Sequence, residues 1–344
     1  MTIKLATVFS GIGSVEHALD RMGVDYEIVF ACDNGNIDIG CVDGLTEDEV
    51  NALYKDTRKT NFVRKSYMAN YECEEENYHL DVRVLDGKPY RDGVDILVGG
   101  SPCQSFSFVG GQEGFCDTRG LLFFEFIRLV DEVRPKAFVF ENVADVLKDD
   151  TWSVMEEAFR GLDYHFVWKV LNAKDYGVPQ NRRRLFVVGF RNDVINDDFV
   201  FDFPAEKILD VTLQDLLEES VEEKYFLSDK MIDYVMSEGT KSFKSKPEVD
   251  LKIARPLLST MHKMHRAGVD NYVTDGGRLR KLTPRECLRL MGFRDDWNIV
   301  CSDTQMYKQI GNSIVVDVLM ALLKEVLKNV RSEIVGRDWQ KEIE

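Results

Sequence analysis

Short apolar runs alternate with amphipathic segments along the first 190 residues of the chain. Segments with helical spacing lie at 15–22, 121–133 and 152–162. Strands that alternate with helices predict a mainly parallel sheet covered on both faces, which is an α/β fold. The apolar runs of strand length lie at 3–9, 26–32, 94–98, 137–140, 165–171 and 185–190.

A polar stretch interrupts this alternation at residues 34–80. It is mixed in charge, has an acidic run near 72–76, and shows helical spacing only near 46–58. We therefore expect an insertion that contains one helix, whose charged side chains are solvated and carry no chemistry.

The alternation ends after residue 190. Residues 191–223 hold eleven acidic side chains, and 224–277 shows only short, weak elements. Helical spacing returns at 283–291 and 313–327, with apolar positions suited to packing on another element. We therefore expect three parts, which are a catalytic domain at 1–190, a small domain at 191–277, and a segment at 278–344 that completes the first domain.

Composition narrows the class of protein. The 344 residues carry 60 acidic and 44 basic side chains, a formal net charge of −16. No apolar stretch has the length of a signal peptide or a membrane span, and the seven cysteines show no paired, metal-like spacing. We expect a cytoplasmic protein without a structural metal, a disulfide scaffold or a membrane partner. Because the chain is acidic, any nucleic acid must be held by local positive charge.

A cysteine follows the predicted strand at 94–98, in the run GGSPCQSFS at 99–107. The glycines permit close approach of a ligand or another backbone, and the proline restricts where the thiol of Cys103 points. The carboxyl end of a parallel strand is where open α/β sheets bind ligands. A nucleophile and a small buried apolar residue both remain open for Cys103.

Charged residues follow two other predicted strands. Glu141 comes directly after the apolar run 137–140, where a catalytic carboxylate and a helix-start carboxylate are both reasonable. In the run QNRRRLF at 180–186, alternation places Arg182 and Arg184 on one side. Two guanidinium groups on one face indicate a binding site for an anion or a carbonyl group. The alternative is a solvated basic loop.

The first strand ends in the glycine loop FSGIG at 9–13. Such loops are common, and this one lacks the third glycine of the dinucleotide fingerprint and a phosphate-loop lysine. Asp33 ends the second predicted strand, which is where a ribose-binding acid lies in this architecture.

Taken together, these motifs resemble the cytosine-C5 DNA methyltransferases of bacterial and phage type. The runs FSGIG, GGSPCQSFS, ENV, QNRRRLF, RKLTPRECLRLMGF and QIGNS occur in that family's linear order and span residues 7–318. The resemblance implies a Rossmann-like sheet that uses S-adenosylmethionine, with a second, smaller target-recognition domain near 191–277.

The resemblance also implies a mechanism. Cys103 would add to C6 of a cytosine, while Glu141 would hydrogen-bond N3 and the exocyclic amine. Arg182 would support the base, and Arg184 would support the active-site network. The C5 atom would then take the methyl group of S-adenosylmethionine. Because that ring edge is buried in a duplex, the base would be flipped, and the loop at 104–119 would close over it.

Binding residues follow from the same resemblance. Phe9 would pack on the adenine, Asp33 would take the ribose hydroxyls, and Asp81 would take the adenine amine, although LDVR at 80–83 departs from the usual motif. The other cofactor residues would be Gly11, Gly13, Asn312 and Ser313. The residues expected at the DNA are Pro102, Gln104, Arg255, Lys263 and Arg266. Thr7 stands where the family commonly has an aspartate.

The implied partner is double-stranded DNA, read in the major groove by the small domain. Residues 251–294 contain ten lysines or arginines and three acids, which predicts a basic cleft on an acidic body. A monomer is expected, since one flipped base needs one active site. A cognate restriction endonuclease is a further partner that the resemblance raises.

Three other functions remain open. A cytosine-C5 methyltransferase for tRNA would share the fold, but its relatives carry a Cys-Phe-Thr tripeptide that 191–277 lacks. A nicotinamide oxidoreductase is favoured only by the glycine loop. A catalytically inactive DNA-binding homologue would leave the cysteine, glutamate and arginines unexplained.

Overall fold

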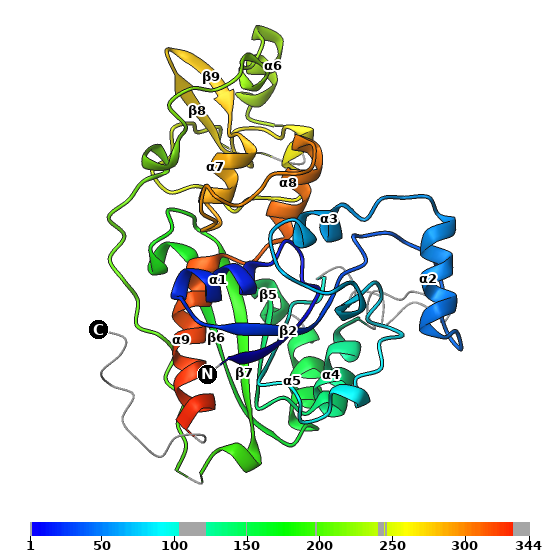
Figure 1. Cartoon of the computed structure of the whole chain (residues 1–344). Helices are drawn as coiled ribbons and strands as arrows, with labels where there is room; N and C mark the ends of the chain where they lie inside the picture. The colour runs from blue at the N-terminus through cyan, green and yellow to red at the C-terminus, as the bar shows by residue number, and fades with distance from the viewer. Residues whose placement is uncertain are drawn as a thin grey trace.

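A seven-stranded sheet forms the centre of the molecule, in the order β3-β2-β1-β4-β5-β7-β6 (Figure 1). The computed structural model describes residues 2–102, 122–148, 150–196, 198–239, 244 and 246–332. Neighbouring strands from β3 to β5 pair in parallel, and β7 runs antiparallel between β5 and β6. The strands are β1 (Ile3–Val8), β2 (Tyr26–Cys32), β3 (Tyr78–His79), β4 (Ile96–Gly99), β5 (Ala137–Val143), β6 (Tyr164–Asn172) and β7 (Arg183–Arg191).

Helices cover both faces of this sheet, which confirms the predicted α/β class. Successive residues of β5 point to opposite sides, so Val139 joins one hydrophobic cluster while Phe138 and Phe140 join the other. The first cluster includes side chains of α1 (Ser14–Met22), α7 (Pro284–Arg289), α8 (Asp303–Asn312) and α9 (Val316–Ser332). The second includes side chains of α4 (Leu122–Val133) and α5 (Thr151–Arg160). The C-terminal segment therefore packs on the same face of the sheet as α1.

The insertion at 34–80 differs from its prediction. Its expected helix is α2 (Glu47–Asp56), but a second helix follows, α3 (Phe62–Met68). This helix is not a solvated appendage, because Ser66 and Tyr67 are fully buried. The Ser66 hydroxyl donates a 2.7 Å hydrogen bond to Gln309 of α8. Most residues of the insertion are polar, so the sequence pattern does not reveal the few residues through which it packs on the rest of the protein.

Beyond β7 lies a small unit with its own two-stranded sheet, seen at the top of Figure 1. A separate cluster formed by Leu227, Val235, Ala267 and Tyr272 gives it a core of its own, which supports a small domain in this region. The unit contains α6 (Asp229–Val235) and the hairpin of β8 (Tyr272–Asp275) and β9 (Arg278–Lys281). The hairpin spans the position after residue 277, where we expected the domain to end.

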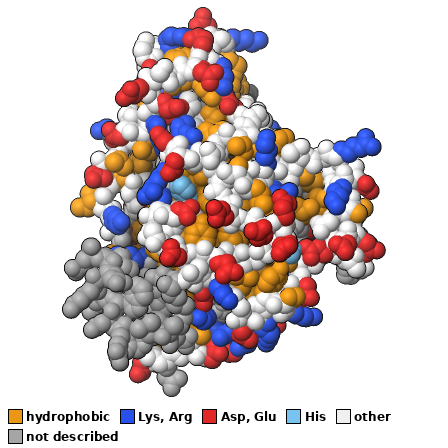
Figure 2. Space-filling view, in the orientation of Figure 1, with side chains coloured by type: hydrophobic (Ala, Val, Ile, Leu, Met, Phe, Trp, Pro, Cys, Tyr) orange, Lys and Arg blue, Asp and Glu red, His pale blue; other side chains and the backbone are white. Residues whose placement is uncertain are grey.

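The surface carries both signs of charge. Acidic and basic side chains are interspersed across the face shown in Figure 2. None of the helices in the described part of the chain has the length and apolar character that a membrane span requires.

Candidate active site

The carboxyl ends of β1, β2, β4 and β5 open into one cleft of about 1100 Å³. Segments far apart in the chain complete its walls, among them α8 and the stretch at 259–263. The predicted site residues that line the cleft are Phe9, Gly11, Asp33, Asp81, Pro102, Glu141, Arg182, Arg184, Lys263 and Asn312. Cys103 and Gln104 lie outside the described residues.

An acid–base pair lies on the floor of the cleft. Glu141 follows the four buried residues that begin β5, and the antiparallel register of β7 sets Arg184 opposite Val143. The two charged groups form an ion pair, with Arg184 Nε 3.0 Å from Glu141 Oε1. Burial raises the pKa of the Glu141 carboxyl, and the charges of Arg184 and Arg182 oppose that rise. A carboxyl in this setting holds a proton closer to neutral pH than an exposed glutamate does.

The segment that leads to Cys103 is held against this pair. Asn142 donates a 3.2 Å hydrogen bond to the Ser101 carbonyl, which ties the end of β4 to β5. A Cβ on Gly100 would lie 3.0 Å from the Glu141 carbonyl oxygen, so a side chain there would press on β5. Gly100 and Ser101 are therefore held against β5, two to three residues before the predicted nucleophile.

The glycine loop forms the other end of the cleft. Phe9 and Gly11 both adopt left-handed backbone conformations, with φ of 54° and 57°. For a phenylalanine this conformation is unfavourable, and such strain is kept mainly where a site needs it. Asp33 accepts hydrogen bonds from the amides of Gly11 and Gly35, at 2.9 and 2.8 Å. An aromatic ring, an open glycine and a carboxylate suit a nucleoside with a free ribose diol.

Three more of the predicted cofactor residues already have protein partners. Asp81 lines the cleft, but its carboxylate is held by Arg83 at 2.6 Å and by the Tyr54 hydroxyl at 2.7 Å. A Cβ on Gly13 would overlap the ring of Tyr71, so this glycine makes room for the insertion. The third is Ser313, whose hydroxyl lies 3.1 Å from that of Ser14, away from the cleft.

Arg182 lines the cleft, but its terminal nitrogens bind backbone carbonyls. It is 4% exposed, and its terminal nitrogens lie 2.9 to 3.0 Å from the carbonyl oxygens of Leu257, Gly311 and Ser313. Burial and the neighbouring Arg184 lower the pKa of its guanidinium, while Glu141 opposes them. Arg182 thereby joins the segment around Leu257 to the end of α8.

Comparison with known proteins identifies the family. The family model for C-5 cytosine-specific DNA methylases matches residues 3–328. The chain belongs to this family. Its general function is therefore C5 methylation of cytosine in DNA, and the family and fold imply use of S-adenosylmethionine in general.

Several relatives of this methylase are known proteins. The type II methyltransferase M.HhaI of Haemophilus parahaemolyticus is 38% identical, over 75% of this chain and 82% of its own length. The type II methyltransferase M.SsoII of Shigella sonnei is 36% identical, over 79% of this chain and 73% of its own length. The solved structure of the S. pombe Dnmt2 methyltransferase matches 95% of this chain and 98% of its own at a TM-score of 0.72. Its identity is 18%, so that match shows the fold alone.

Two residues that we expected at the DNA do not line the cleft of this methylase. Arg255 pairs with Glu248 at 3.2 Å. Arg266 donates a 2.8 Å hydrogen bond to Ser237 and lies over the Tyr234 ring. A count of basic residues along the sequence overstated the free positive charge, because acids from other segments neutralise part of it.

The sequence motifs also contained a positioning residue that we did not single out. Gln180, the first residue of QNRRRLF, is fully buried. Its side chain donates to the Leu290 carbonyl at 2.7 Å and accepts from the Leu257 amide at 3.0 Å. Together with Arg182 it holds both backbone polar groups of Leu257. The position of Gln180 at the start of the QNRRRLF motif is the sequence feature that could have indicated this role.

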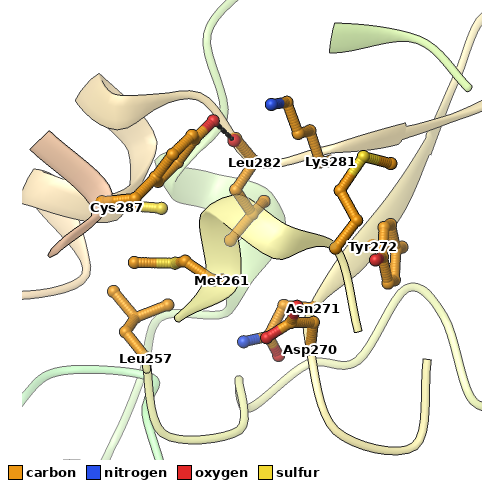
Figure 3. Close-up of a pocket in the computed structure, with 10 residues that line it drawn as sticks. Leu257, Met261, Asp270, Asn271, Tyr272, Lys281, Leu282 and Cys287 are labelled. Carbon is orange, nitrogen blue, oxygen red and sulfur yellow. Dashed lines mark hydrogen bonds between the residues drawn. The ribbon is translucent and has the colours of Figure 1, made fainter. Parts of the chain in front are cut away.

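The segment around Leu257 packs closely on the C-terminal part of the methylase. A Cβ on Gly311 would overlap the backbone of Leu258 and Ser259, so only glycine fits this crossing. Figure 3 shows the neighbouring contact, where Leu257 and Met261 face Cys287 around a cavity of about 20 Å³. This volume suits about one water molecule. We call this contact the seam, defined as residues 257–261 against α7 and α8.

A buried carboxylate lies beneath the glycine loop. Glu16 in α1 has no exposed surface, and its Oε1 atom is 3.1 Å from Thr7 Oγ1 and 2.7 Å from the Tyr67 hydroxyl. Its Oε2 atom has no hydrogen-bond partner among the described residues. Burial raises its pKa from 4.5 to about 7, against the hydrogen bonds of Tyr67 and Thr7. Glu16 thus brings a carboxyl group to Thr7, where the family commonly has an aspartate.

The raised pKa of Glu16 makes stability depend on pH. The folded state binds the proton of Glu16 more tightly than the unfolded state does. The stability that this proton adds is therefore fully present below about pH 4.5 and is lost as pH rises to about 7. We expect Glu16→Gln to gain stability relative to the wild type as pH rises from 5 to 8. The free energy of unfolding of the variant minus that of the wild type should increase by up to about 3 kcal/mol over this range. Urea unfolding at both pH values measures this. The exposed Glu27→Gln is the control, and equal shifts in the two variants would contradict the expectation.

Proposed function

We propose that this protein methylates C5 of a flipped cytosine in a specific duplex DNA sequence, through a covalent bond between Cys103 and C6. The ion pair of Glu141 and Arg184 beside Pro102 carries the proposal. It places a carboxyl group whose pKa is raised by burial in the cleft that Pro102, the residue before Cys103, also lines. A nicotinamide oxidoreductase would have no use for that arrangement.

Each group has a defined part in the chemistry. Glu141 binds N3 and the exocyclic amine, and its proton on N3 makes the ring accept the thiolate of Cys103. Attack at C6 leaves C5 rich in electrons. Arg184 orients the Glu141 carboxyl. Once C5 has taken the methyl group, loss of the C5 proton to solvent, departure of the Cys103 thiolate and return of the N3 proton to Glu141 restore the ring.

The glycine-loop end of the cleft takes the cofactor. When bound there, S-adenosylmethionine supplies the methyl group. Phe9 contacts the adenine, Asp33 the ribose hydroxyls, and the open face of Gly11 with Asn312 the methionine portion. Asp81 reaches the adenine amine only by sharing an oxygen that Arg83 or Tyr54 already holds.

The partner is duplex DNA, bound by a monomer. Relatives of this protein include type II methyltransferases and an orphan methyltransferase of Bacillus phage SPR, which is 29% identical over 94% of this chain. We propose that it acts either with a cognate restriction endonuclease or alone.

A labelling experiment tests the function. The protein is incubated with methyl-labelled S-adenosylmethionine and duplex DNA, beside a tRNA lane and a Cys103→Ala control. Label on DNA cytosines that the control lacks supports the proposal. Label on tRNA alone replaces it with the tRNA methyltransferase. Absence of label in both lanes, with cofactor binding intact, replaces it with the inactive DNA-binding homologue.

A further inference from the structure

Three lysines from separate parts of the chain line the same cleft. Lys59 lies in the insertion, between α2 and α3, and Lys308 lies in α8. Lys263 ends the short helical turn that follows the seam. All three side chains are exposed. The insertion, for which sequence alone gave no chemistry, therefore contributes a cation to the site.

These lysines differ from several arginines of the basic stretch 251–294. Among the ion pairs of the described residues, none involves Lys59, Lys263 or Lys308. By contrast, four arginines of the basic stretch 251–294 pair with acids, namely Arg255, Arg278, Arg280 and Arg289. In a chain with a net charge of −16, three free cations at one cleft are the local positive charge that an anionic partner needs.

The insertion holds Lys59 in a defined place. Two residues further on, Asn61 donates a 2.9 Å hydrogen bond to the Asp33 carbonyl and accepts one from the Arg64 amide. The first bond ties the start of α3 to the end of β2, and the bond from Ser66 to Gln309 ties α3 to α8. The helix that follows Lys59 is therefore held both to the end of β2 and to α8, whose residues line the cleft.

We propose that Lys59 binds a phosphate of the DNA duplex, together with Lys263 and Lys308. The insertion is then part of the DNA-binding surface, and it contacts the strand from the side of the cofactor end. This inference rests on the proposed function. A cofactor carboxylate is the other anion within the cleft, but three exposed lysines on separate walls match a polyanion better than a single carboxylate.

Salt-dependent DNA binding tests the proposal. Anisotropy of a short fluorescent duplex of mixed sequence is measured with S-adenosylhomocysteine between ~50 and ~200 mM salt, for the wild type, Lys59→Gln and Lys55→Gln. Lys55 is the matched control, since it is exposed on α2 in the same insertion and does not line the cleft. We expect Lys59→Gln to weaken binding about 3- to 10-fold and to reduce the salt slope by about 0.9, with Lys55→Gln near the wild type.

The other outcomes overturn the proposal in distinguishable ways. If both variants weaken DNA binding equally, the effect is one of general charge. If Lys59→Gln binds DNA as the wild type does, Lys59 does not contact a phosphate. Calorimetry with S-adenosylhomocysteine alone shows weaker binding in Lys59→Gln if the lysine holds the cofactor instead. If the wild type transfers no methyl to DNA and binds no duplex, the proposed function and this inference both fall. Methyl transfer with an unchanged Lys59→Gln overturns only the inference.

Discussion

Replacing Glu141 by glutamine is expected to lower kcat for DNA methylation by about 10²- to 10⁴-fold. The amide keeps the shape of the side chain and can still hydrogen-bond the base. It has no proton to place on the ring nitrogen, so C6 accepts the thiolate poorly. Single-turnover transfer of a labelled methyl group to DNA measures the change.

The pH profile separates this role from a structural one. Burial raises the pKa of the Glu141 carboxyl, so wild-type activity should fall as pH rises through that pKa and the proton is lost. The residual activity of Glu141→Gln should lack this fall, while its affinity for S-adenosylhomocysteine stays unchanged. A rate within threefold of the wild type would remove Glu141 from the mechanism.

Replacing Arg182 by methionine is expected to cost about 3–5 kcal/mol of unfolding free energy. The change leaves the carbonyls of Leu257, Gly311 and Ser313 without their donors in a buried place. Hydrogen bonds to a charged donor are stronger than neutral ones, so three of them are a large loss. Urea unfolding should show a lower midpoint with an unchanged slope.

The adjacent Arg183 gives a matched control for this substitution. It is exposed and does not line the cleft. Arg183→Met should therefore change stability by no more than about 0.5 kcal/mol. If the two variants are equally stable, Arg182 does not hold the seam.

Sequence patterns predicted the parts of the fold that depend on local periodicity. The strand at 26–32 has the predicted limits, and the helix predicted at 15–22 differs by one residue from Ser14–Met22. The resemblance placed Glu141, Arg182 and Arg184 in one site, and the cleft contains all three. The antiparallel direction of β7, which the sequence did not predict, brings the amino end of that strand to the edge where β5 ends. Alternation also separated Arg183 from its neighbours.

What sequence missed depends on partners that are distant in the chain. Whether an arginine is free depends on an acid such as Glu248, which no local pattern reveals. Gly13 was read as space for a ligand, but the ring of Tyr71 packs there. The helix α3 was missed because only seven residues form it, and its stability comes from burial against α1 and α8.

The contacts at the seam also leave its side chains unusually free to vary. Gln180, Arg182 and Gly311 bind backbone atoms around Leu257, so they place few demands on which side chains stand there. The stretch between β7 and Ala254 is bounded by the strand on one side and by the 2.7 Å hydrogen bond from the Ala254 amide to Pro179 on the other. Side chains between those two points can therefore vary while the backbone contacts that hold the seam to the cleft stay the same.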